Sequence, residues 1–355
     1  MEKLQINSLF PKQIIIKNDM NDEWNGKYIE GSVQYKDKNS ISYLKDDNHH
    51  VYLYNGLWKL GKNGVKVYKQ LGNEISNEID ARKIKSVEEN LKKINDFFLK
   101  SLLKGNQTVK NKNCICMMCI KPSQIWIDFL LEIKKKYDYD IFVVVDDNSK
   151  IYEIDGIYII QIGDKICKEH GFFNANFCVK RNVPSSWDKM FFYFSYHNNY
   201  KNYWVIEEDV FIPIIETISC IDKKYSSLKD TVLIRSNYKK ESNTFLDWHW
   251  GNMKFKNGFA FPIPWFCSEV CAVRLPNPFL YECKQFVLDK KQLFFIEFFI
   301  NTLADKRNIN VKTIDELSEI HIRKNYVLDD FKNKNKMYHA VKDINFHKKI
   351  RNSYK

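Results

Sequence analysis

Three consecutive acidic residues, Glu207, Glu208 and Asp209, interrupt an apolar stretch of the chain. Residues 203–206 are aromatic and β-branched, which is typical of a strand, and residues 210–215 are again apolar. Unpaired charges are costly to bury, so these acids need a cation, a basic partner or exposure at the end of the strand. Because carboxylate oxygens are the ligands that hard divalent cations prefer, we predict a metal site here. The alternative is the polar tip of a strand entering a turn.

A second acidic pair, Asp146 and Asp147, follows an apolar run, and strand-like and helix-like segments alternate around it. Strands are expected at residues 113–120, 141–145 and 157–162, and helices at about 122–136 and 187–197. Strand, helix, strand units of this length form right-handed parallel crossovers, which bring the carboxyl ends of strands to one edge of a sheet. We therefore expect both acidic groups at that edge, with a turn-capping pair as the alternative for Asp146 and Asp147.

The chain is predicted to contain two domains and a connector. Residues 1–75 show short hairpin-like runs separated by turn residues, which predicts a small antiparallel β domain. Residues 76–110 carry apolar side chains three and four apart, which predicts a helical connector. Residues 111–355 are predicted to form the larger domain. The fold class expected is α/β, with a Rossmann-like mixed sheet and flanking helices preceded by the small all-β domain.

The larger domain resembles the nucleotide-sugar-dependent glycosyltransferases of the GT-A fold. In that family one strand ends in Asp-Asp-x-Ser near the nucleotide base, and a later strand ends in an Asp-x-Asp-type metal motif. Residues 143–149 (VVVDDNS) match the first pattern, and residues 205–210 (VIEEDV) resemble the second, with Glu207 in the leading position. The resemblance covers about residues 110–345. It implies a GT-A-like domain that transfers a sugar from a UDP- or GDP-sugar to a hydroxyl of a glycan, protein or small molecule.

The resemblance also implies a cofactor and its ligands. Mn²⁺ or Mg²⁺ would neutralise the charge that grows on the leaving nucleoside diphosphate, and thiol-preferring metals are not expected. The implied metal ligands are Glu207, Asp209 and His339, with His321 as the competing histidine. The residues implied to bind the nucleotide-sugar are Asp146, Asp147, Lys189, Glu208 and Lys342. A solvated surface lysine is the alternative for Lys189.

Glu297 stands alone in the apolar, helix-like run of residues 293–300. The resemblance implies a catalytic base at about this point in inverting transferases, so we expect Glu297 to take the proton from the acceptor hydroxyl. A buried ion pair is the alternative. The segment between the metal strand and Glu297 is expected to face the acceptor, where aromatic rings would stack on sugars. The candidate acceptor-binding residues are Trp248, Trp250 and Trp265, with core packing as the alternative for at least one of them.

The nine cysteines are an odd number, which fits reduced thiols in the cytoplasm, or in the host cytoplasm if the chain is viral. A zinc site built from Cys116, Cys119, Cys267 and Cys271 is not expected, because alternation along a strand would point Cys116 and Cys119 to opposite faces. Neither a secretory signal nor a membrane span is expected, because the apolar runs are short and interrupted.

The formal net charge is +12, which suggests an acidic ligand. Because Lys, Asn, Ile, Tyr and Phe are all abundant, part of this excess is attributable to an AT-rich genome, and nucleic acid is not the expected partner. Three alternatives stay open. A sugar nucleotidyltransferase would normally carry a glycine-rich loop that residues 119–124 lack. The others are a basic nucleic-acid-binding protein that stacks bases on the N-terminal sheet, and an inactive scaffold.

Overall fold

The computed structural model of the 355-residue chain describes residues 13–16, 26–30, 42–44, 49–54, 57–62, 92–93, 110–176, 182–197, 199–240, 264–321 and 324–354. The chain divides into two compact units, Met1–Glu89 and Asn90–Lys355. The predicted connector helix lies outside the described residues, apart from Lys92 and Lys93, which are helical.

The first unit contains a five-stranded antiparallel sheet whose strands are neighbours in chain order. Its strands are β1 (Gln13–Ile16), β2 (Gly26–Glu30), β3 (Ser42–Leu44), β4 (His49–Tyr54) and β5 (Leu57–Lys62). Such neighbour-to-neighbour pairing is what short strands separated by turn residues favour.

The second unit is built on a seven-stranded sheet with the order β14-β10-β13-β9-β6-β7-β8. Its strands are β6 (Lys110–Cys119), β7 (Asp140–Val145), β8 (Tyr158–Ile160), β9 (Tyr200–Glu207), β10 (Thr231–Ile234), β13 (Ala272–Pro276) and β14 (Asn310–Thr313). Neighbouring strands are parallel, except that β13 is antiparallel to both β10 and β9. The predicted mixed sheet of an α/β domain is therefore confirmed.

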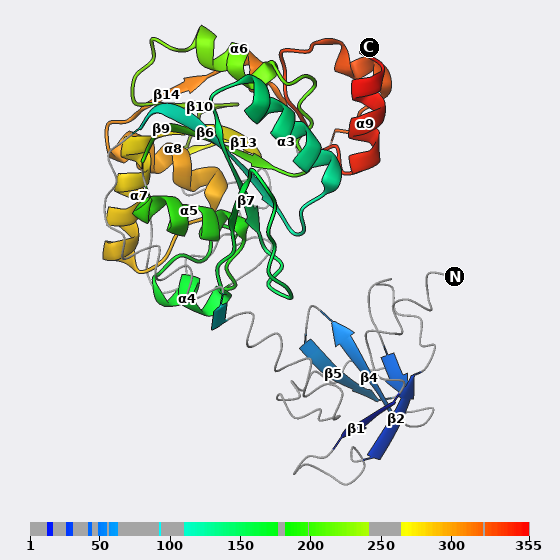
Figure 1. Ribbon diagram of the computed structural model, residues 1–355. Coiled ribbons are helices and arrows are strands. Elements are labelled where there is room, and N and C mark those ends of the chain that lie inside the picture. The colour runs from blue at the N-terminus through cyan, green and yellow to red at the C-terminus, as the bar shows by residue number, and fades with distance from the viewer. Residues whose placement is uncertain are drawn as a thin grey trace. The chain divides into compact units, whose positions relative to one another are not determined.

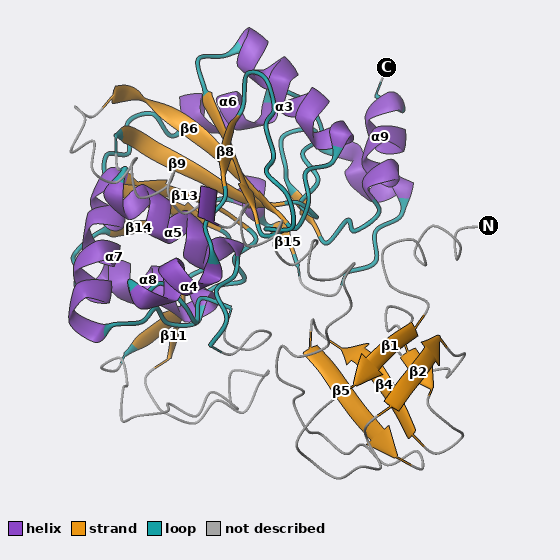
Figure 2. Cartoon of the chain, turned by 60° about the horizontal axis from the view of Figure 1, so that its bottom comes forward, coloured by secondary structure: helices purple, strands orange, loops and turns teal. Residues whose placement is uncertain are grey.

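Helices cover both faces of this sheet (Figures 1 and 2). The helices are α3 (Gln124–Lys136), α4 (Asp164–Glu169), α5 (Ser186–Tyr196), α6 (Thr217–Lys224), α7 (Asn277–Lys290), α8 (Ile296–Lys306) and α9 (Ile344–Asn352). Helices α3 and α6 lie on one face, and α5, α7 and α8 lie on the other (Figure 1). None of the helices in the described part of the chain is long and apolar enough to cross a membrane.

Strand β6 is buried on both faces, as expected for a parallel strand between two layers of helices. Its alternate side chains enter two different cores. Cys116 packs in the core on the α5, α7 and α8 side, whereas Cys119 packs in the core on the α3 and α6 side. The prediction that these two thiols point to opposite faces is confirmed, and they cannot share one zinc ion.

Smaller elements complete the unit. The two-stranded sheets are β11 (Tyr238–Lys240) with β12 (Trp265–Cys267), and β15 (Glu319–Ile320) with β16 (Tyr338–His339). Two 3-10 helices span Asp315–Leu317 and Leu328–Lys332. The β15–β16 pair lies late in the chain, yet the bridge between Phe211 and Tyr338 attaches it to the segment that follows β9.

The first residue of β7, Asp140, holds three central strands together at their amino ends. Its carboxylate accepts hydrogen bonds from Lys110 Nζ at 3.0 Å, Lys112 Nζ at 2.9 Å and the Tyr200 hydroxyl at 2.5 Å. Although burial acts to raise the pKa of Asp140, these hydrogen bonds lower it from 3.8 to about 2. The network thereby favours the alignment of β6, β7 and β9 at the edge opposite the acidic strand end.

We predict that Asp140→Asn lowers the free energy of unfolding at neutral pH by about 1 kcal/mol, after allowance for solvent screening. Because the folded pKa lies below 3.8, this contribution is present above about pH 4 and is lost as the pH falls toward about 2. Urea unfolding of both proteins at several pH values measures the difference. Asp138→Asn is the matched control, since Asp138 is 85% exposed and pairs with the same Lys112. The prediction would be contradicted if the difference in free energy of unfolding between the native protein and Asp140→Asn did not change with pH.

Candidate functional site

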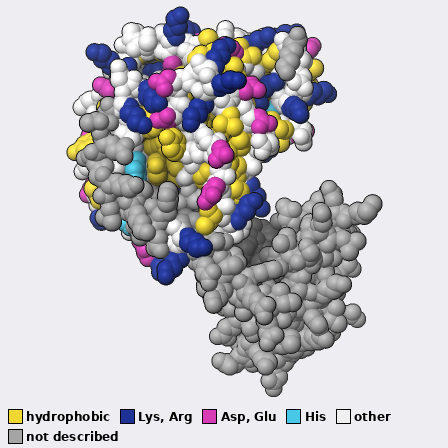
Figure 3. Space-filling model, viewed as in Figure 1, with side chains coloured by type: hydrophobic (Ala, Val, Ile, Leu, Met, Phe, Trp, Pro, Cys, Tyr) yellow, Lys and Arg dark blue, Asp and Glu magenta, His cyan; other side chains and the backbone are white. Residues whose placement is uncertain are grey.

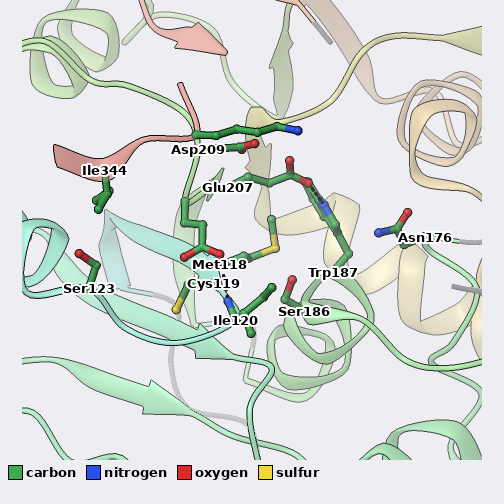
Figure 4. Close-up of a pocket in the computed structure, with 12 residues that line it drawn as sticks. Met118, Cys119, Ile120, Ser123, Asn176, Ser186, Trp187, Glu207, Asp209 and Ile344 are labelled. Atoms are coloured by element: carbon green, nitrogen blue, oxygen red, sulfur yellow. Dashed lines mark hydrogen bonds between the residues drawn. The ribbon is translucent and has the colours of Figure 1, made fainter. Parts of the chain in front are cut away.

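The sheet reverses its chain order between β6 and β9. Strands β6, β7 and β8 follow one another toward one edge, and β9 then returns to the other side of β6. Where strand order reverses, the connections leave in opposite directions and a crevice opens outside the carboxyl ends of the two strands. A pocket of about 480 Å³ lies at this position, lined by Met118, Cys119, Ile120, Ser123, Asn176, Ser186, Trp187, Glu207, Glu208, Asp209, Lys342 and Ile344 (Figure 4).

Glu207 and Asp209 point into the same space above the strand ends (Figure 4). Asp209 Oδ1 lies 3.2 Å from Nε2 of His339, and Glu207 Oε2 lies 4.0 Å from the same nitrogen. Glu208 is held differently: its Oε1 accepts a hydrogen bond from the Ile120 N–H at 3.2 Å. The structure therefore brings together the three residues predicted to bind metal, and it gives Glu208 a backbone partner at the wall of the pocket.

A backbone hydrogen bond sets the direction of the His339 ring. Its Nδ1 lies 2.8 Å from the carbonyl oxygen of His321, to which it can only donate. The ring therefore turns Nε2 toward the two acids, as the imidazole of a metal ligand does when its other nitrogen is held by a carbonyl. The His321 ring instead places Nδ1 at 3.0 Å from Arg235 Nη2. Of the two candidate histidines, His339 is the one beside the acids.

Two further side chains at this site, Trp187 and Cys271, were not predicted. The Trp187 indole nitrogen donates to Glu207 Oε1 at 2.6 Å from the first turn of α5, which begins with a capping box of Ser185 and Asp188 (Figure 4). The thiol of Cys271 lies within 4.8 Å of a Glu207 carboxylate oxygen.

The position of Cys271 follows from a pairing between distant segments. Cys271 directly precedes β13, which runs antiparallel to β9 with Ala272 opposite Ile206. The Glu207 N–H donates to the Cys271 carbonyl at 2.8 Å. Ligand atoms of Glu207, Cys271 and His339 all lie within 4.8 Å of one another. The signal in the sequence was a cysteine before an apolar strand, which does not identify the strand with which it pairs.

The charges of the cluster favour a cation. Burial and the nearby charge of Asp209 raise the pKa of Glu207. Burial also acts to raise the pKa of Asp209, but the hydrogen bond and charge of His339 lower it overall. The pKa of His339 is raised by Asp209 and Glu207 against the effect of burial. Two carboxylates and one imidazole therefore face one another, and these are groups that bind divalent cations once the imidazole is neutral.

Lys342 is one of the residues that line the pocket, whereas Glu297 is not among them. Glu297 is 8% exposed in the first turn of α8, and its carbonyl accepts a hydrogen bond from the Ser268 N–H at 2.9 Å. Burial raises the pKa of the Cys271 thiol, and the charge of Glu297 adds to that effect together with the two acids of the cluster. Lys342 lines the pocket, and its charge contributes to lowering the pKa of Asp209.

Asp146 and Lys189 form a buried ion pair beside the site. Lys189 Nζ lies 2.7 Å from Asp146 Oδ1 and 2.8 Å from Asp164 Oδ1, and its side chain has no solvent exposure. Burial acts to lower the pKa of Lys189, but the two carboxylates raise it overall. The alternative of a solvated surface lysine is therefore wrong. Lys189 neutralises Asp146 and does not line the pocket.

Asp147 serves the turn after β7. Its carboxylate accepts hydrogen bonds from the Ser149 N–H at 2.9 Å and the Tyr152 hydroxyl at 2.7 Å. Burial acts to raise the pKa of Asp147, but these hydrogen bonds lower it overall. This is the turn-capping arrangement that the sequence left as an alternative. Asp147, like Asp146, is not among the residues that line the pocket.

Trp265 is a core residue. It is 3% exposed in β12, and its ring makes edge-on contacts with Phe294 and Phe298, with centroid distances of 6.2 and 5.7 Å. An acceptor sugar cannot stack on a ring whose faces are covered, so the expected acceptor role of Trp265 is wrong. Trp248 and Trp250 lie outside the described residues.

No protein-family model matches the chain, and no curated protein is significantly similar to it.

Loss of the Lys189 ammonium is predicted to destabilise the domain. Lys189→Met would remove a fully buried ammonium from Asp146, whose side chain is 14% exposed, so the free energy of unfolding should fall by about 3 kcal/mol. Lys165→Met is the control, because Lys165 is 86% exposed and lies 3.9 Å from Glu169; it should change that free energy by less than about 0.5 kcal/mol. Urea unfolding measures both effects. Equal stabilities of the two variants would show that the buried pair is not required.

Proposed function

We propose that the chain is a metal-dependent glycosyltransferase, which transfers a sugar from a nucleotide-sugar to a hydroxyl acceptor with inversion at the anomeric carbon. One observation carries the proposal. Two carboxylates and an imidazole converge at the strand-order reversal of a Rossmann-like sheet, with Asp209 and Glu207 at 3.2 and 4.0 Å from His339 Nε2. Nucleotides bind at such reversals, and a cation beside them serves to stabilise a diphosphate leaving group.

The side chains at this site are of the types that bind the divalent cation needed for this reaction. Glu207, Asp209 and His339 would hold the cation, and the cation would neutralise charge on the departing diphosphate. Trp187 and the His321 carbonyl keep Glu207 and His339 in place through their hydrogen bonds. The pocket also contains one lysine, Lys342, which is placed to pair with a diphosphate oxygen.

Glu297 is the proposed general base. Its place in the first turn of α8 and its low exposure give a carboxylate that solvent does not freely reach. In the proposed reaction Glu297 accepts the proton of the acceptor hydroxyl while that oxygen attacks the anomeric carbon, and the nucleoside diphosphate leaves with the electrons of the broken bond. Inversion follows because the attack and departure occur on opposite sides of the ring.

The surface charge gives less support to a nucleic-acid-binding function. On the face drawn in Figure 3, Lys and Arg side chains are interspersed with Asp, Glu and apolar groups. A phosphate backbone is bound best by basic side chains that gather in a groove or stripe. The acidic pocket also disfavours a polyanion without an intervening cation.

Binding of the donor tests the metal site of this proposal. In a thermal-shift panel of nucleotide-sugars, one donor should raise the melting temperature with Mn²⁺ or Mg²⁺ present and not with EDTA, because a ligand of the folded state stabilises it. Asp209→Asn should abolish this shift. Asp155→Asn, a change at an exposed turn residue, is the control and should retain it. Metal-dependent shifts of equal size in both variants would contradict the assignment of Asp209.

Measurement of kcat tests the role of Glu297 as the general base. Glu297→Gln should reduce kcat by about 100-fold to 10,000-fold, because the acceptor hydroxyl loses its proton acceptor. Donor affinity should be unchanged, since Glu297 acts on the acceptor. Retained turnover in this variant would place the base elsewhere.

A further inference from the structure

Cys271 gives the acidic cluster a ligand that hard cations do not prefer. Its Sγ, one Glu207 oxygen and a His339 ring nitrogen lie within 4.8 Å of one another. In a tetrahedral site with bonds of about 2.0 to 2.3 Å, such atoms lie roughly 3.5 Å apart. Side-chain rotations that move these atoms by about 1 Å would therefore close them around an ion.

The three ligand residues are held from outside the cluster, as ligands of a built metal site are. The backbone hydrogen bond from Glu207 to the Cys271 carbonyl fixes those two residues next to each other across β9 and β13. The Trp187 indole holds one Glu207 oxygen, and the His321 carbonyl holds His339 Nδ1. The sulfur, a Glu207 carboxylate oxygen and a ring nitrogen of His339 face one another, and His339 Nε2 also lies 3.2 Å from Asp209 Oδ1.

We propose that Glu207, Cys271 and His339 bind Zn²⁺ in preference to Mn²⁺ or Mg²⁺, with the fourth position facing Asp209 and the pocket. Thiolate ligands select zinc over the hard cations, and three protein ligands with one open position are typical of catalytic zinc. On binding, the Cys271 S–H bond and the His339 Nε2–H bond directed at Asp209 break, the sulfur and Nε2 each form a bond to zinc, and both protons pass to the solvent. Zn²⁺ would then be the cation that the proposed glycosyltransferase uses, so this inference rests on the metal site of the proposed function. This preference for Zn²⁺ differs from the expectation that thiol-preferring metals do not fit.

Cobalt substitution tests the sulfur ligand directly. Metal-free protein titrated with Co²⁺ should develop the near-ultraviolet charge-transfer absorption of a cobalt thiolate, and displacement by Zn²⁺ should remove it. Competition titrations should give a Zn²⁺ affinity at least about tenfold above that for Mn²⁺. Cys271→Ser should remove the absorption and weaken Zn²⁺ binding at least about tenfold, with little change for Mn²⁺.

Cys220→Ser is the matched control, because Cys220 is an exposed free thiol on α6 and its loss should leave the absorption and both affinities unchanged. Should Cys271→Ser not fold, the cobalt spectrum of the native protein decides by itself. A native spectrum without the charge-transfer absorption, or Mn²⁺ binding as tight as Zn²⁺, would overturn the sulfur ligand while leaving a carboxylate metal site for the transferase. Failure to bind any divalent cation would overturn both proposals.

Discussion

The parallel pairing of β6 with β9 places Met118 opposite Glu207 at the carboxyl edge of the sheet, and the candidate site depends on this register. The strand order reverses at this pair, so the crevice opens where Glu207 and Asp209 leave the sheet. A slip by one residue would exchange the two faces of β9 and move Val205 and Ile206 into the wrong cores. The hydrogen bonds of Asp140 at the other edge oppose such a slip.

Negative charge at the end of a buried strand is tolerated only where it is compensated. His339, the Trp187 indole and the backbone N–H of Ile120 supply part of that compensation. The raised pKa of Glu207, caused by burial and by Asp209, is the physical sign that compensation is incomplete. A bound cation would complete it, which links the stability of this edge of the sheet to its proposed chemistry.

The sequence predicted the features that local patterns determine and missed those that distant pairings determine. Apolar runs ending in acids located β7 and β9, and Glu207, Asp209 and His339 do meet. Cys271 was missed because its place beside Glu207 results from the antiparallel pairing of β13 with β9. The ion pair of Lys189 was also missed, because its partner Asp146 is 43 residues away in the chain. The roles of single residues stay predictions wherever they depend on a bound ligand.

Anomalous diffraction from crystals of the native protein soaked in a low concentration of Zn²⁺ tests the central claim most directly. We predict a peak at the zinc edge within bonding distance of Glu207, Cys271 and His339, beside Asp209 in the crevice between β6 and β9. Zinc found only at surface histidines or acids, with the crevice lacking an anomalous peak, would contradict a metal centre at this site.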